Sequence, residues 1–209
     1  RGYDSAGIAV FDGAKIGVEK SVGRLAALRD KLKGHELKGT MGIGHTRWAT
    51  HGRPSDVNSH PHTDCSGDFV VVHNGIIENY LALKEELIAK GVEFTSDTDT
   101  EVVAHLMADL FDGDMESTVK KVLKVIKGSY SLVFMCEAEQ DKIICTKKDN
   151  PLVIGLGEGE NFIASDIPAI INHTRRTFIM SDGEIATVTK DGVWVQDIEG
   201  TPINKKVFE

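Results

Sequence analysis

The sequence has no dense cluster of lysine or arginine, although its 209 residues include 24 of them. With 32 Asp and Glu residues the formal net charge is -8, which argues against a nucleic-acid-binding surface. No apolar run approaches the ~20 residues that a membrane-spanning helix needs, and no charged-then-apolar leader is present. We therefore expect neither nucleic acid nor a membrane as a partner.

Cysteine is also scarce, with three residues at positions 65, 136 and 145. An odd number in a chain of this length does not suggest a disulfide framework, so we expect a reducing, cytoplasmic setting. Cys136 and Cys145 fall in apolar stretches that are typical of packed thiols. Cys65 lies in a polar stretch with no neighbouring cation, and a Gly-x-Ser-x-Gly elbow is absent. The residues alone therefore offer no obvious nucleophile.

The chain is rich in short apolar stretches, and most of its helical patterns are grouped in the middle. Strands are expected at residues 7–11, 15–22, 41–46, 69–73, 131–136, 142–146, 152–156, 161–164, 184–188 and 193–196. Helices are expected at residues 25–32, 80–90 and 116–127, and from residue 98 onward behind a capping box at 98–101. Many strands are joined by tight turns and the helices do not alternate with them, which predicts an α+β fold with mostly antiparallel sheets. We find no repeat or low-complexity linker, so we expect one domain over residues 1–209.

The most unusual segment is residues 45–52, which read His-Thr-Arg-Trp-Ala-Thr-His-Gly. Loops that concentrate such side chains directly after a strand often carry binding or catalysis. The guanidinium of Arg47 suits bidentate recognition of a carboxylate. A surface loop with a packed Trp48 explains the spacing equally well.

A second segment, His73-Asn74-Gly75, follows an apolar strand that we expect to break at Asn74. The side-chain amide of Asn74 and the backbone N–H of Gly75 are two donors that together could form an oxyanion hole. Asn-Gly is more often a type I′ turn. No return strand follows Gly75, which weakens the turn interpretation.

Acidic and histidine residues raise the question of a metal. Asp97 and Asp99 begin a pattern that lacks the Gly and Glu of a calcium loop. Asp99 is then either an acid at a helix start or an anchor for a substrate ammonium group. The four histidines between positions 45 and 62 match no standard zinc spacing. We expect no metal and no cofactor.

Together these segments resemble the glutaminase domain of the glutamine–fructose-6-phosphate aminotransferase family. The resemblance runs in order through residues 1–7, 45–52, 72–79, 97–101, 151–157 and 161–166. It implies an N-terminal-nucleophile hydrolase fold, a four-layer α-β-β-α sandwich. It also implies hydrolysis of L-glutamine to glutamate and ammonia through a thioester on an N-terminal Cys, the ammonia then passing to fructose 6-phosphate to form glucosamine 6-phosphate.

The resemblance assigns roles to individual residues. Asn74 and the backbone N–H of Gly75 would hold the oxyanion. Arg47 would bind the α-carboxylate of glutamine and Asp99 its α-ammonium group. Trp48 would gate the passage of ammonia.

Five further positions complete the implied site. Thr50, His51 and His60 would line the glutamine pocket, and Arg1 and Gly2 would position the terminal thiol. In the family, the segment that matches the first residues of this chain lies a strand and a helix after the Cys. The resemblance therefore implies that the nucleophile, the first strand and the first helix lie outside these 209 residues, and that the chain is inactive alone.

The resemblance also implies partners and leaves alternatives. Covalently linked sugar-phosphate isomerase domains would use the ammonia, and a homodimer would form through those domains. One alternative is the glutaminase half of an amidophosphoribosyltransferase or asparagine synthetase. Another is a non-catalytic glutamine-binding module that keeps the pocket without the nucleophile.

Overall fold

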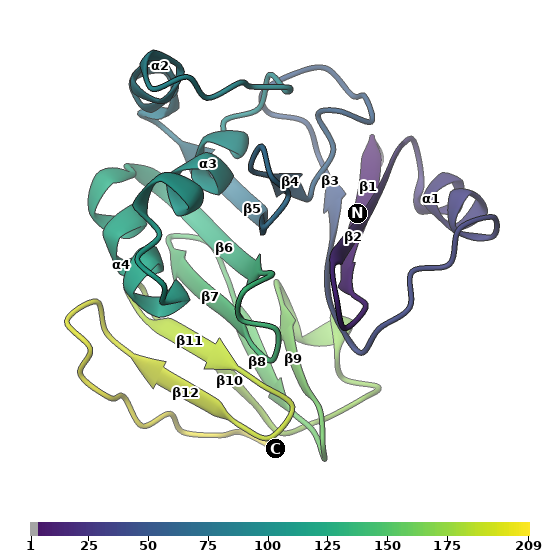
Figure 1. The fold of residues 1–209 in the computed structure, drawn as a ribbon. Coiled ribbons are helices and arrows are strands. Elements are labelled where there is room, and N and C mark those ends of the chain that lie inside the picture. The colour runs from purple at the N-terminus through teal and green to yellow at the C-terminus, as the bar shows by residue number, and fades with distance from the viewer. Residues whose placement is uncertain (1–3) are drawn as a thin grey trace.

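The computed structural model describes residues 4–209, which form three antiparallel sheets with helices on the outside (Figure 1). The strand orders are β2-β1-β3, β10-β8-β9 and β12-β11-β7-β6-β5-β4. The strands are β1 (Ser5–Phe11), β2 (Ile16–Val22), β3 (Met41–Arg47), β4 (His62–Thr63), β5 (Phe69–Ile77), β6 (Gly128–Cys136), β7 (Ile143–Lys148), β8 (Val153–Leu156), β9 (Asn161–Ala164), β10 (Thr177–Ile179), β11 (Ile185–Val188) and β12 (Val193–Gln196). The helices are α1 (Leu25–Leu32), α2 (Tyr80–Ala89), α3 (Glu101–Leu110), α4 (Met115–Val125) and the 3-10 turn η1 (Ile167–Ala169).

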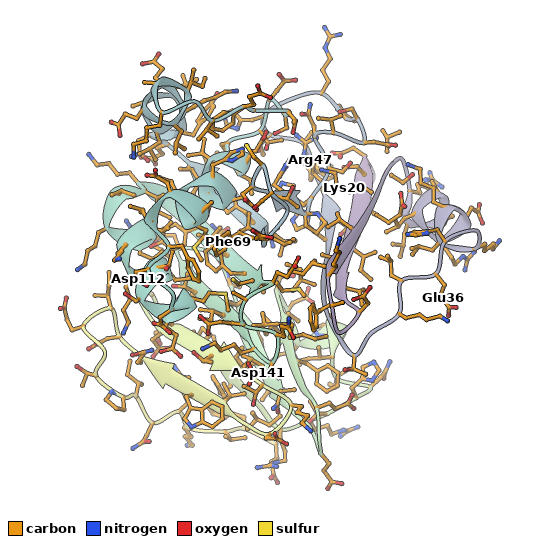
Figure 2. All side chains as sticks on the ribbon, viewed as in Figure 1. Lys20, Glu36, Arg47, Phe69, Asp112 and Asp141 are labelled. Atoms are coloured by element: carbon orange, nitrogen blue, oxygen red, sulfur yellow. The ribbon has the colours of Figure 1, made fainter. Side chains whose placement is uncertain are left out.

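The six-stranded sheet is buried on both faces. Along β5, Val71 packs in the core shared with α2, α3 and α4, whereas Val72 packs in a second core shared with the two small sheets. Phe69, labelled in Figure 2, belongs to the helical side. Its ring meets that of Phe111 edge-on, with 5.0 Å between the ring centroids. Helix α1 packs on β1 and β2 and buries Leu28. The expected α+β sandwich is confirmed, with one of its two β layers divided into two three-stranded sheets.

Strand β5 corrects the predicted break at Asn74. The strand continues to Ile77, with Asn74 opposite Ser131 and Gly75 opposite Tyr130 in β6. The backbone φ of Gly75 is 121°, and a Cβ there would lie 2.2 Å from the carbonyl oxygen of Ser129. Glycine is required because the two strands approach this closely at a positive φ. The Asn-Gly pair is therefore not a hairpin turn.

The start of α3 corrects the predicted capping box. The helix begins at Glu101, and its N-cap Thr100 makes no side-chain capping bond. The hydroxyl of Thr98 instead bonds Nε2 of His62 at 3.0 Å. The Glu101 carboxylate accepts the backbone N–H groups of Thr95 and Ser96 at 2.8 and 2.6 Å. These side chains hold the loop before the helix in place, and they make these bonds instead of capping the helix N-terminus.

The remaining elements agree with the expected ones to within a few residues. The β1–β2 and β11–β12 hairpins, α2 and α4 are confirmed. Strands β4 and β10 were not predicted, because two- and three-residue strands carry no periodicity. Within residues 4–209, no helix combines the length and apolarity needed to cross a membrane.

Candidate active site

A cavity of about 890 Å³ is lined by residues of β1, α1, β3, β5, β6 and β9 and of the loops beside them. It brings together every expected site residue in the described part of the chain, namely Arg47, Trp48, Thr50, His51, His60, Asn74, Gly75 and Asp99. Arg1 and Gly2 lie outside the described residues. Cys65, Cys136 and Cys145 do not line the cavity, and all three are free thiols. The described residues therefore place polar groups in this cavity without a cysteine thiol.

Asn74 is held by a histidine from the neighbouring sheet. Its Oδ1 lies 2.7 Å from Nε2 of His45, and this oxygen can only accept a hydrogen bond, so His45 must donate. The NH₂ group of the Asn74 side chain then remains free to donate hydrogen bonds to a ligand in the cavity. Gly75 lines the same cavity beside Asn74. Two amide donors at this position could stabilise a developing oxyanion.

Arg47 ends β3 and is only 4% exposed. One guanidinium nitrogen, Nη2, donates to the backbone carbonyls of His51 and Gly52, the latter at 3.0 Å. The other, Nη1, is buried without a hydrogen-bond partner among the described residues. Burial lowers the pKa of Arg47, while the charges of Asp4 and Asp99 act in the opposite direction. A buried donor of this kind is suited to an anionic ligand.

Asp99 supplies the opposite charge. It is 4% exposed and lines the cavity from the loop before α3. Its Oδ2 accepts the backbone N–H of Ile77 at 2.7 Å and lies 3.9 Å from Nδ1 of His73. An α-amino acid carries one anion and one cation on the same carbon, so Arg47 and Asp99 together provide a complementary pair of charges.

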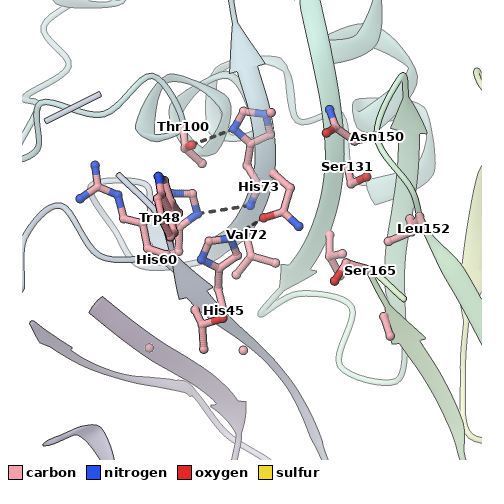
Figure 3. Close-up of a pocket in the computed structure, with 18 of the residues that line it drawn as sticks. His45, Trp48, His60, Val72, His73, Thr100, Ser131, Asn150, Leu152 and Ser165 are labelled. Atoms are coloured by element: carbon pink, nitrogen blue, oxygen red, sulfur yellow. Dashed lines mark hydrogen bonds between the residues drawn. The ribbon is translucent and has the colours of Figure 1, made fainter. Parts of the chain in front are cut away.

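Three histidines, His45, His60 and His73, line one wall of the cavity (Figure 3), and His62 packs against His60 behind them. The rings of His45 and His60 stack at 4.2 Å, and His60 meets His62 edge-on at 4.8 Å. Burial lowers the pKa of His45 to about 4 and that of His62 to about 3, and it also lowers the pKa values of His60 and His73. These rings are therefore neutral near pH 7. They act as hydrogen-bonding groups and add no positive charge beside Arg47.

The loops that carry Arg47, His60 and Asp99 are tied together by side chains. Asn58 accepts the backbone N–H of Asp97 at 2.9 Å and donates to the carbonyl of Arg53 at 2.9 Å. Lys20 donates to the carbonyls of Val57 and Pro61, each at 3.2 Å. The carboxyl-rich loop before α3 is thereby fixed against the loop that follows β3, which holds the cavity in shape.

Trp48 and Thr50 lie at the exposed rim of the cavity. Trp48 is 72% exposed although it lines the cavity. Within residues 4–209, no group of three or more His, Cys, Asp or Glu side chains could hold a metal ion.

Sequence reasoning did not assign several polar residues to the cavity. They are His45, His73, Thr98, Thr100, Ser131, Asn150 and Ser165. His73 directly precedes Asn74 and His45 opens the segment 45–52, so both could have been included on that ground. Ser131, Asn150 and Ser165 come from β6 and the segments around β8 and β9, and no local pattern marks them.

Comparisons with known proteins agree with this geometry. The family model described as glutamine amidotransferase domain matches residues 45–172. The chain is 52% identical to glutamine--fructose-6-phosphate aminotransferase [isomerizing] of Aquifex aeolicus and 53% identical to that of Caldanaerobacter subterraneus subsp. tengcongensis. Both matches cover 100% of this chain but only 35% and 34% of those proteins. The chain thus spans about a third of the length of its curated relatives.

Among solved structures, the chain resembles glutamine phosphoribosylpyrophosphate amidotransferase from B. subtilis. The TM-score is 0.77 at 28% identity, covering 94% of this chain and 43% of that one. The identity is about half of that to the aminotransferases, so the aminotransferase relatives are the nearer group.

Proposed function

Because the chain belongs to the glutamine amidotransferase domains of the glutamine--fructose-6-phosphate aminotransferase family, we propose that its cavity binds L-glutamine and hydrolyses the side-chain amide. The ammonia released would be delivered to fructose 6-phosphate, giving glucosamine 6-phosphate. The glutaminase step would take place here, and the sugar chemistry in domains beyond this third of the relatives' length.

One observation carries the proposal. Arg47, Asn74 and Asp99 come from three different segments, yet all line one cavity. Nη1 of Arg47 would receive the α-carboxylate of glutamine, and the carboxylate of Asp99 would receive the α-ammonium group. The side chain of the bound amino acid would then extend toward Asn74 and Gly75. Thr50, His51 and His60 would complete the wall around it.

The reaction would proceed by nucleophilic catalysis. A thiolate attacks the amide carbon and forms a tetrahedral intermediate whose oxyanion accepts hydrogen bonds from the Asn74 amide and the Gly75 N–H. Collapse of the intermediate, with a proton transferred to the leaving nitrogen, releases ammonia and leaves a thioester. Water then cleaves the thioester to glutamate and restores the thiol. Arg1 and Gly2 would position that thiol.

We propose that the segment that would carry the thiol lies between two strands at the edges of the small sheets. Strands β3 and β9 each end their three-stranded sheet in the described chain. Residues 42–44 of β3 and residues 161–163 of β9 line a common cavity of about 210 Å³, next to the larger one. An extended segment inserted there would pair with both edges and join the two small sheets, which removes two open strand edges. Its end would reach the cavity that contains Asn74.

The full-length protein provides the test. We expect it to release ammonia and glutamate from L-glutamine and to form glucosamine 6-phosphate when fructose 6-phosphate is supplied. Replacing its N-terminal Cys by Ala, or using the 209-residue chain alone, should abolish glutamine turnover. Turnover that persists in either case would disprove the role of that thiol, and transfer to phosphoribosylpyrophosphate instead would identify the other amidotransferase class.

The same proposal covers the partners. Linked sugar-phosphate isomerase domains would receive the ammonia, a homodimer would form through them, and Trp48 at the rim would gate the transfer. A cytoplasmic location agrees with the three free thiols. A glutamine-binding module without catalysis would bind glutamine in calorimetry while the full-length protein showed no turnover.

A further inference from the structure

We infer that His45 is a positioning residue that fixes the orientation of the Asn74 side-chain amide, so that its NH₂ group, and not its carbonyl oxygen, faces the developing oxyanion. The inference rests on the proposed function. It concerns a histidine to which the family resemblance and the relatives' names give no role.

The first step is the hydrogen bond between the two side chains. An asparagine amide has a donor pole and an acceptor pole of nearly the same shape, and rotation by half a turn exchanges them. The donor pole stabilises an oxyanion, whereas the acceptor pole repels it. Oδ1 of Asn74 lies 2.7 Å from Nε2 of His45, which donates to it. With the amide turned by half a turn, its NH₂ would face Nε2 and would require the other tautomer of the ring.

The second step is the tautomer of His45. Donation from Nε2 by a neutral ring leaves Nδ1 without a proton. Nδ1 of His45 is buried and makes no hydrogen bond among the described residues, so a proton on that atom would be left without an acceptor. Burial lowers the pKa of His45 to about 4, which keeps the ring neutral. The tautomer that holds Asn74 in the donating orientation is thus the one that the surroundings allow.

The third step is the rigidity of the ring itself. His45 stacks on His60 with 17° between the planes. His60 is in turn fixed, because its Nδ1 accepts the backbone N–H of His73 at 3.3 Å. His73 immediately precedes Asn74 in β5. The series of contacts from Asn74 through His45 and His60 therefore returns to the residue next to Asn74. The ring of His45 is therefore held in one orientation, and its Nε2–H points at Oδ1 of Asn74.

A packing role alone would give a different result, and His45→Phe separates the two. Phenylalanine keeps the ring and the stack on His60 but cannot donate to Asn74. In the full-length protein we expect His45→Phe to lower kcat for glutamine hydrolysis about tenfold, with KM nearly unchanged. Asn74→Ala removes the donor itself and should lower kcat by about 100-fold or more. His45→Gln restores an N–H donor and should recover part of the loss.

The decisive measurement is a double-mutant cycle between His45→Phe and Asn74→Ala. If His45 acts through Asn74, the double variant has the kcat of Asn74→Ala alone. An equal additional loss in both backgrounds would overturn the inference, because His45 would then act independently. A normal kcat for His45→Phe beside a low kcat for Asn74→Ala would overturn it as well. A normal kcat for Asn74→Ala would instead remove the oxyanion role from the proposed function.

Discussion

The carboxylate of Asp99 accepts a hydrogen bond from the backbone N–H of Ile77, the last residue of β5, at 2.7 Å. This bond fixes the loop before α3 to the strand that carries Asn74. The anionic group and the amide donors are therefore held at a constant separation, which a substrate with charged and reactive ends requires.

Two substitutions at Asp99 separate its charge from its hydrogen bond. We expect Asp99→Asn and Asp99→Ala both to raise KM for glutamine by about 10- to 100-fold, because each removes the charge opposite the ammonium group. Asparagine can still accept the N–H of Ile77, so only Asp99→Ala should also lower the free energy of unfolding, by about 1–3 kcal/mol. Steady-state kinetics and urea unfolding measure the two effects. An unchanged KM for Asp99→Asn would contradict the assignment.

Arg47→Lys tests carboxylate recognition. Lysine keeps the positive charge but lacks the two terminal nitrogens of the planar guanidinium group. In Arg47, Nη2 donates to the loop carbonyls, and Nη1 is left for a ligand. We expect KM for glutamine to rise about tenfold or more while kcat changes less. Arg53 is exposed and does not line the cavity, so Arg53→Lys is the matched control and should leave KM unchanged. Equal effects of the two substitutions would argue against a ligand role for Arg47.

Much of the fold follows from local patterns, whereas the cavity depends on contacts that no local pattern contains. The apolar run of β5 is visible in the sequence because both faces of the strand are buried. The extension of the strand through Gly75 is not visible, since it depends on the carbonyl of Ser129 across the sheet. Likewise, the capping-box pattern before α3 is overruled by bonds to His62 and Ile77, which lie far away in the sequence.

The same distinction applies to the site. Arg47, Asn74 and Asp99 were assigned from motifs, and their common cavity agrees with that assignment. The partnership of His45 with Asn74 could not be predicted, because 29 positions separate the residues and a sheet-to-sheet contact joins them. Ser131 and Asn150 were missed for the same reason.

Gly75→Ala should be strongly destabilising for two reasons that can be separated. An alanine Cβ would meet the Ser129 carbonyl at 2.2 Å, and φ is 121°. Gly13 has a comparable φ of 100° but has no atom within 4 Å of the same position, so Gly13→Ala carries the backbone strain alone. We expect Gly13→Ala to cost about 1–2 kcal/mol and Gly75→Ala roughly twice as much or more. Similar unfolding free energies for the two variants in urea would refute the steric argument.

The buried histidines predict a specific pH dependence of stability. Their pKa values are lower in the folded chain than the ordinary 6.5, reaching about 4 for His45 and about 3 for His62. Between those values and pH 6.5 the unfolded chain binds protons that the folded chain does not. The contribution of these histidines to the free energy of unfolding is therefore greatest above pH 6.5. It falls as the pH is lowered, by up to about 1.4 kcal/mol per pH unit for each histidine.

His62→Phe isolates one of these contributions. The slope of the unfolding free energy against pH between 5 and 6.5 should decrease by up to about 1.4 kcal/mol per unit relative to the unsubstituted chain. The absolute stability also changes, because the bond to Thr98 is lost, but the slope does not depend on that offset. Hydrogen bonds hold the pKa of Glu101 at about 2 although burial alone would raise it, so this carboxylate stays ionised throughout the window. An unaltered slope would show that His62 titrates alike in both states.

Trp48→Ala tests whether the rim of the cavity retains ammonia. The indole is 72% exposed while lining the cavity, so its removal should widen the opening to solvent and leave Arg47, Asn74 and Asp99 in place. Glutamine hydrolysis in the full-length protein should then change little, whereas the ratio of glucosamine 6-phosphate to glutamate should fall several-fold, because ammonia that escapes into water is protonated and lost. Trp48→Phe keeps an aromatic ring and should preserve most of the coupling. If Trp48→Ala lowers both products equally, the tryptophan serves hydrolysis itself and has no separate part in the transfer.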